Sequence, residues 1–305
     1  MRNRGPIHLA RIRGIDLGLH WSWFLVALIE IQLRSGVYTF IGWNILEYLT
    51  LFLIVTVHEY GHALACRSVG GAADRIVLWP LGGIAYVDPP QRAGAMLWSI
   101  AAGPLVNVAL IPVLWLAWHW SLGSTWMLAH ADALTFMHSV VYINAGLLIF
   151  NMIPVYPLDG GQILRSLLWF PLGRARSLMT AAIVGLIGVV GLGLIALRMR
   201  DLLLGAIAVF ILMNCWGGLK RAQALTRLAK LPRHAGFLCP WCHTSPLAGP
   251  YWQCRECGQR FNPFESGAAC PGCHAAYDPT VCSDCGHPNP MPQWISPLPV
   301  KTAAV

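Results

Sequence analysis

The chain carries the run LFLIVTVHEYGHALAC at residues 51–66, where two histidines and a glutamate interrupt an otherwise apolar stretch. The run belongs to a longer apolar segment, residues 41–66, which is long enough to cross the hydrocarbon core of a bilayer as a helix of about 20 residues. Placing an ionisable side chain at membrane depth costs free energy, so such a residue indicates a functional site. The run therefore predicts a membrane-spanning helix that carries a functional site.

The composition of the whole chain points to the same class of protein. Of its 305 residues, 56% are hydrophobic and 11% are charged, and the mean hydropathy is +0.56. Soluble domains contain about 25% charged residues. We predict an α-helical polytopic membrane protein with six spans. These lie near residues 19–33, 41–66, 95–118, 133–153, 178–197 and 202–219.

Positive charge is concentrated in alternate connections between the predicted spans. The N-terminal arm, residues 67–92, residues 165–176 and residues 220–233 are rich in Lys and Arg. Such connections stay in the cytoplasm, so we predict a multi-pass protein of the plasma (inner) membrane with both termini cytoplasmic. The net charge of +8 follows from this arrangement, because basic flanks contact the anionic headgroups of the lipid bilayer.

The pentad HEYGH at residues 58–62 has the spacing of a metal site. Residues i and i+4 share one face of a helix, so the imidazoles of His58 and His62 can reach one ion. Glu59 projects to the side, where it can take a proton from a water molecule. The alternative is a polar cluster that only holds neighbouring helices together, and membrane depth makes it the weaker reading.

A second motif, NMIPVYPLDGG at residues 151–161, follows the fourth predicted span. Pro154 and Pro157 prevent a regular helix there, and Gly160 and Gly161 let the backbone turn. Irregular backbone at membrane depth is tolerated where it lines a cavity or is buried in protein. Asp159 on such a break suits a third metal ligand, although a simple turn that caps the next helix would use the same residues.

The predicted topology joins the two motifs. The second and the fourth span both end at the cytoplasmic side, so His58, His62 and Asp159 can meet at similar depth. Neutral imidazoles suit zinc, and three protein ligands leave a fourth position open. The sequence therefore predicts one zinc site that is built from both motifs.

Together these motifs resemble the site-2 protease family of intramembrane zinc metalloproteases. The sequence AGPLVN at residues 102–107 is similar to the family's Gly-Pro-x-x-Asn element, and residues 19–22 and 79–83 also fit. The resemblance covers residues 5–219. It implies a six-helix core that hydrolyses peptide bonds of membrane-spanning protein substrates, in or near the cytoplasmic half of the bilayer.

The resemblance also implies a role for each residue of the site. Three side chains hold the catalytic zinc: His58, His62 and Asp159. Glu59 acts as the general base, and Asn151 and Asn107 assist the binding of the substrate or the transition state.

Beyond the predicted core, residues 1–219, the chain divides into three further parts. Residues 220–238 form a basic juxtamembrane connector, residues 239–286 a double zinc-ribbon module, and residues 287–305 a Pro-rich disordered tail. Within the core, residues 75–88 are β-prone and broken by Pro and Gly, which predicts a small β-hairpin at the membrane surface. This hairpin could hold an unwound substrate segment by strand addition.

Eight cysteines in the module at residues 239–286 form four Cys-x-x-Cys knuckles, which is a strong zinc signal. The cytoplasm keeps thiols reduced, so metal binding is favoured over disulfides. Sequential pairing gives two structural zinc sites, and a cross-braced pairing stays open. The first site uses Cys239, Cys242, Cys254 and Cys257, and the second uses Cys270, Cys273, Cys282 and Cys285.

The charge of the cysteine-rich part bears on its partners. Residues 239–301 hold three basic residues against four acidic ones, which argues against a nucleic-acid partner. A protein partner is the favoured reading beside a purely structural role for the zinc.

Two other classes of function remain as alternatives. A membrane transporter would show paired broken helices in related halves, and the sequence has no such repeat. A catalytically inactive membrane adaptor would have lost Glu59 or a metal ligand, and all of these residues are present.

Overall fold

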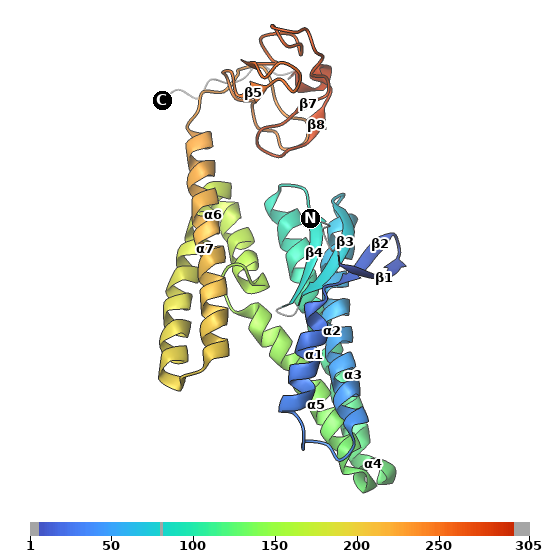
Figure 1. Cartoon of the computed structure of the whole chain (residues 1–305). Helices are drawn as coiled ribbons and strands as arrows, with labels where there is room; N and C mark the ends of the chain where they lie inside the picture. The colour runs from blue at the N-terminus through green and yellow to red at the C-terminus, as the bar shows by residue number, and fades with distance from the viewer. Residues whose placement is uncertain (1–5, 80–81, 296–305) are drawn as a thin grey trace. The chain divides into compact units, whose positions relative to one another are not determined.

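The structure is a computed structural model that describes residues 6–79 and 82–295. Contacts divide the chain into two compact units, Met1–Ala222 and Gln223–Val305. The first unit contains the long helices and a four-stranded sheet, which lies at one end of the helices α1, α2 and α3 (Figure 1). The short helix α4 (Thr125–Ala129) lies at the opposite end of α3.

Four helices of the described residues are long and apolar enough to cross a membrane. They are α2 (Ile41–Ser68), α3 (Ala93–Gly123), α5 (Ala131–Met152) and α6 (Asp159–Met199). The prediction of a helical polytopic membrane protein with a small sheet is confirmed, but two of the six predicted spans are not among these four. The first forms α1 (Ser22–Leu33), whose 12 residues are fewer than the roughly 20 that a span needs. The last is part of α7 (Leu202–Ala229), which runs on into the predicted basic connector.

The sheet contains the predicted hairpin and a second one that the sequence did not reveal. Its strands pair in the order β1 (Ile7–Ile12), β2 (Ile15–Leu19), β3 (Ala72–Trp79) and β4 (Gly82–Asp88). The β1–β2 turn places Arg13 and Gly14 at φ values of 50° and 75°. Two-residue turns of this kind match the twist of the flanking strands, so residues 7–19 of the N-terminal region fold as a strand pair.

The sheet packs on the part of α2 that carries the HEYGH pentad. β2 pairs in parallel with β3 and turns Ile15, Leu17 and Leu19 towards the helix. These side chains form a buried apolar cluster with Ile76 and Leu78 of β3 and with side chains of α2. Burial of this kind stabilises by about 25 cal/mol per Å² of apolar area, so the sheet holds the end of α2 that contains the histidines.

α6 consists of two helical segments that meet at Gly173. The backbone of this glycine has φ 77° and ψ 172°, outside the helical region, and a side chain at such a positive φ would be strained. The first segment, residues 159–172, covers most of the basic connection predicted at residues 165–176, which is therefore helical rather than a loop. The second segment continues as the long apolar part of α6.

The second unit is built from very short strands. β5 (Trp252–Gln253) pairs with β6 (Arg260–Phe261), and β7 (Thr280–Val281) pairs with β8 (Pro288–Asn289). A 3-10 helix, η1 (Met291–Trp294), follows.

The prediction of a disordered tail from residue 287 is wrong for residues 287–295. Trp294 is fully buried, its indole N–H donates to the carbonyl oxygen of Asn289 at 3.1 Å, and its ring packs against Phe264. The burial of Trp294 and the pairing of β8 give this segment a defined structure despite its Pro-rich composition. Residues 296–305 of the predicted tail lie outside the described residues.

Candidate metal centre

Three side chains of the two sequence motifs meet at one point. His58 and His62 lie one turn apart on α2, and Asp159 is the first residue of α6. Oδ2 of Asp159 lies 3.1 Å from Nε2 of His58 and 3.4 Å from Nε2 of His62, and the two Nε2 atoms are 3.1 Å apart. The structure thus brings together the three residues that the sequence suggested as ligands.

These separations suit a zinc ion. Nitrogen or oxygen ligands about 2.0–2.2 Å from one tetrahedral ion are about 3.3–3.6 Å apart, close to the three distances between the donor atoms. Two imidazole nitrogens and one carboxylate oxygen form a donor set that zinc accepts, with a fourth position left open. The histidines are 3% and 8% exposed, so neither is a solvated surface residue.

Hydrogen bonds on the far side of each imidazole fix which nitrogen faces the carboxylate. Nδ1 of His58 lies 2.6 Å from Oδ1 of Asn107, and Nδ1 of His62 lies 2.9 Å from the carbonyl oxygen of Ser99. Both partners are acceptors, so each Nδ1 carries the proton and each Nε2 keeps its lone pair. Such contacts orient the ligand and raise its basicity.

Asn144 of α5 completes this arrangement, and the sequence analysis missed it. Its Oδ1 accepts a hydrogen bond from Nδ2 of Asn107 at 2.8 Å, and its own Nδ2 donates to the backbone oxygen of Asn107 at 3.1 Å. The amide of Asn107 is therefore held with its oxygen towards His58. A lone asparagine has no spacing pattern, and its only signal was a polar amide inside an apolar span, where it needs a partner.

The structure gives Asn107 a different environment from the one expected of a substrate-binding residue. Its side chain is fully buried between His58 and Asn144. Asn151, the other residue suggested for this role, is half-buried in the last turn of α5.

Glycines let α3 approach the two histidines. A Cβ on Gly103 would lie 2.8 Å from Nε2 of His58 and closer still to the ring of His62. A Cβ on Gly61 of α2 would lie 2.7 Å from the carbonyl oxygen of Ala102. The AGPLVN element therefore contributes close packing as well as Asn107.

Replacing Gly103 with alanine is expected to weaken zinc binding at this site by at least about tenfold, because the added methyl group displaces both imidazoles. Zinc per purified chain, measured by elemental mass spectrometry after dialysis against a weak chelator, checks this. Gly146→Ala is the matched control, since among the described residues no atom beyond its own helix backbone lies within 4 Å of a Cβ added there. Equal zinc retention in both variants would contradict the packing argument.

Two further glycines place Asp159. Cβ atoms on Gly160 and Gly161 would lie 2.6 Å from the carbonyl oxygen of Ile153 and 2.7 Å from that of Val155. α6 can therefore begin directly against the irregular segment that follows α5. This contact turns the first residue of α6 towards the histidines.

Glu59 lies beside the metal ligands on α2. It is 7% exposed and close enough to His62 to interact with it electrostatically. A carboxylate at this position is suited to exchange a proton with a group bound at the open coordination position.

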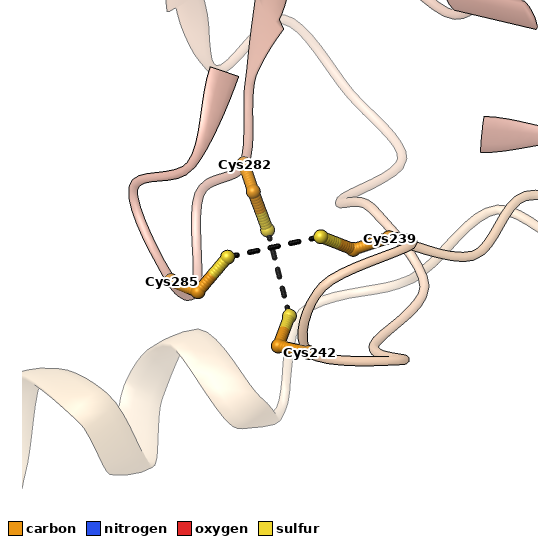
Figure 2. A group of neighbouring side chains, drawn as sticks. All are labelled: Cys239, Cys242, Cys282 and Cys285. Carbon is orange, nitrogen blue, oxygen red and sulfur yellow. Dashed lines mark hydrogen bonds between the residues drawn. The ribbon is translucent and has the colours of Figure 1, made fainter. Parts of the chain in front are cut away.

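The eight cysteines of the second unit form two clusters, but not in the sequential pairing. Figure 2 shows the outer cluster, in which Cys239 and Cys242 face Cys282 and Cys285. The inner cluster contains Cys254, Cys257, Cys270 and Cys273.

The predicted sequential pairing is therefore wrong, and so is the cross-braced alternative. The first knuckle pairs with the fourth and the second with the third, so the pairing is nested. The two ends of this module meet because Phe237 and Ile295 form a β-bridge, and the β7–β8 pair flanks the last knuckle. The spacing of the knuckles along the sequence does not reveal these long-range contacts.

Sulfur distances in both clusters suit zinc. Facing sulfurs are 3.7 and 3.8 Å apart in the outer cluster and 3.5 and 3.6 Å apart in the inner one. Four sulfurs about 2.3 Å from one tetrahedral ion are about 3.8 Å apart, whereas a disulfide needs about 2.05 Å. The hydrogen bond from Cys282 lowers the pKa of the Cys242 thiol, so this sulfur can supply a thiolate to a metal.

Comparison with known proteins gives one consistent result. The sequence profile of Peptidase family M50 matches residues 47–125 and 119–195. The chain is 32% identical over 181 residues to the zinc metalloprotease MJ0392 of Methanocaldococcus jannaschii, a match over 59% of this chain and 50% of that protein. It is 29% identical over 221 residues to the putative zinc metalloprotease Rip3 of Mycobacterium tuberculosis, over 67% of this chain and 54% of that protein.

A solved structure agrees with these sequence matches. The site-2 protease from Methanocaldococcus jannaschii superposes with a TM-score of 0.51 and 26% sequence identity, over 70% of this chain and 95% of that one. The chain spans about half the length of the curated relatives it matches.

Proposed function

Because the chain belongs to peptidase family M50, the family of the site-2 proteases, we propose that it is an intramembrane zinc metalloprotease. Its reaction is the hydrolysis of peptide bonds of membrane-spanning substrates, in or near the cytoplasmic half of the bilayer. The observation that carries this proposal is the meeting of His58, His62 and Asp159 at spacings that suit one zinc ion.

His58, His62 and Asp159 hold the catalytic zinc in this proposal. Zinc, when bound, supplies a Lewis acid that polarises a carbonyl group and makes water more acidic. Asn107 and Ser99 keep both Nε2 atoms aimed at the ion, and Asn144 keeps Asn107 in place. We assign Asn107 to orienting His58, since its buried amide already faces that ring.

Glu59 is the general base. Its carboxylate accepts the proton of the attacking water and passes it to the leaving amine. The side chain of Glu59 is only 7% exposed, so bulk water has little access to this carboxylate. Asn151, at the end of α5, remains our candidate for contact with the substrate backbone.

The sheet offers a place for the unwound substrate. A helix hides its carbonyl groups in internal hydrogen bonds, so the segment to be cut must be extended first. β4 is the last strand in the pairing order of the sheet and contacts α2. A substrate strand added beside β4 would have its backbone groups satisfied while it lies near the helix that carries the histidines.

The placement in the membrane is part of the proposal. Basic residues of the N-terminal arm, of the connection after α2 and of the end of α7 favour a cytoplasmic position for both termini in the plasma (inner) membrane. The two cysteine clusters would then hold two structural zinc ions in a reducing compartment. We propose a protein partner for this module, without a nucleic-acid role.

Metal removal tests the proposed function. The purified chain, reconstituted with a panel of single-span reporter proteins, is expected to cut at least one of them. Cleavage should stop with 1,10-phenanthroline and return with added zinc but not with magnesium. Cleavage that continues in the chelator, or a fully zinc-loaded chain that cuts no reporter, would contradict the proposal.

A further inference from the structure

Two arginines lie beside one tryptophan in the first segment of α6, and a third arginine lies near one of them. The guanidinium carbons of Arg165 and Arg174 lie 5.8 and 5.9 Å from the centre of the Trp169 ring. Arg221, near the end of the apolar part of α7, is close enough to Arg165 to repel its charge, as is Arg174. We call Arg165, Arg174, Arg221 and Trp169 the basic cluster.

Arg165 lacks a counter-ion within the described part of the chain. Its Nε is buried and has no hydrogen-bond partner there, and no carboxylate of those residues forms an ion pair with it. The charges of Arg174 and Arg221 repel it, and only the phenol group of Tyr156 interacts with it favourably. A partly buried guanidinium among like charges is unfavourable unless an anion joins it, so the cluster is complete only with an anionic ligand.

The surroundings of the cluster indicate where this anion comes from. Leu167 and Phe170, on the same helical segment, are 50% and 64% exposed, as expected for side chains that contact lipid tails. Trp169 between them suits the interface between tails and headgroups. The cluster therefore lies at the depth of lipid phosphates, on the side of the membrane where anionic lipids are abundant.

We propose that the basic cluster binds the phosphate group of an anionic phospholipid. Guanidinium groups offer the forked donors that phosphate oxygens accept, and the Nε of Arg165 is one such donor. This proposal rests on the membrane placement given above but not on the protease activity. It has a consequence for the metal centre, because the segment that carries Arg165 and Trp169 begins at Asp159. A bound lipid would hold the helix that presents this ligand.

Lipid retention tests the proposal without any cleavage assay. The full chain is taken into nanodiscs of phosphatidylcholine alone or mixed with phosphatidylglycerol, extracted into detergent, and its retained lipids are counted by native mass spectrometry. We expect preferential retention of phosphatidylglycerol, reduced about fivefold for each arginine removed, in Arg165→Gln and in the double variant Arg165→Gln/Arg221→Gln. Arg198→Gln, at the other end of α6, is the matched control and should behave as wild type.

Additional variants and competing anions distinguish a lipid site from the other possible results. If Arg165→Gln fails to fold, Arg165→Lys and Arg221→Gln take its place. Arg165→Lys should keep most of the lipid retention, whereas Arg221→Gln, at an exposed residue, should lower it about fivefold. Equal retention by all variants, or an equal loss in Arg198→Gln, would overturn the proposal. Displacement of the lipid by the same concentration of inorganic phosphate, or by an acidic peptide, would also overturn it, because the ligand would then be a free anion or a protein.

Discussion

Replacing Glu59 with glutamine is expected to abolish cleavage while leaving the zinc content unchanged. Glutamine keeps the shape of the side chain but cannot accept the proton of the attacking water. Loss of a general base lowers a rate by about 10²–10⁴-fold. Glu59 is not one of the three side chains whose donor atoms converge, so its removal should not release the ion. Reporter cleavage and zinc per chain, measured on the same preparation, check both halves of this prediction.

Tyr60→Phe is the matched control for Glu59→Gln. The Tyr60 hydroxyl is buried and has no hydrogen-bond partner among the described residues, so its loss should leave both cleavage and zinc intact. Cleavage at the wild-type rate by Glu59→Gln would remove the proposed base. Loss of zinc from that variant would make Glu59 a ligand instead.

Paired cysteine substitutions are expected to distinguish the nested clusters from the sequential pairing. The proposal gives the full chain three zinc ions, one catalytic and two structural. Cys239→Ser/Cys285→Ser changes two residues of the outer cluster and should reduce zinc by one. Cys239→Ser/Cys257→Ser changes one residue in each cluster and should reduce it by two. Structural zinc contributes about 10–16 kcal/mol to folding, so these losses should also open the second unit to proteolysis.

The sequential pairing predicts the reverse order. Cys239 and Cys257 would share a site, whereas Cys239 and Cys285 would belong to different ones. A loss of one zinc ion from the Cys239/Cys257 variant and of two from the Cys239/Cys285 variant would therefore contradict the nested arrangement. Cys66→Ser, a change in the first unit whose hydroxyl can still donate to the carbonyl oxygen of Ala72, controls for the substitution itself.

The candidate metal centre could be predicted because its signals are local. His58 and His62 have a helical spacing that a sequence displays directly, and Asp159 sits on a break that Pro and Gly mark. The two halves could be joined because membrane topology limits where span ends can lie. Asn144 escaped detection because its role depends on the packing of α5 against α3, which no spacing rule encodes.

Other parts of the fold depended on long-range contacts. The hairpin of β3 and β4 was visible from its residues, but its pairing with β2 joins positions far apart in the chain. The cysteine knuckles indicated metal sites but not which knuckles share a site, because that pairing depends on long-range contacts such as β7–β8 and the burial of Trp294. The sequence did not predict a helix at residues 159–172. Its basic side chains indicate a cytoplasmic connection, but they are equally compatible with a helix at the membrane surface.

Locating the metal directly tests the central claim. An anomalous difference map at the zinc edge, calculated from crystals of the purified chain, should show three peaks. One of them should lie about 2.0–2.2 Å from Nε2 of His58, Nε2 of His62 and a carboxylate oxygen of Asp159. A map with peaks only at the cysteine clusters, or with the Asp159 carboxylate well away from both imidazoles, would contradict the account.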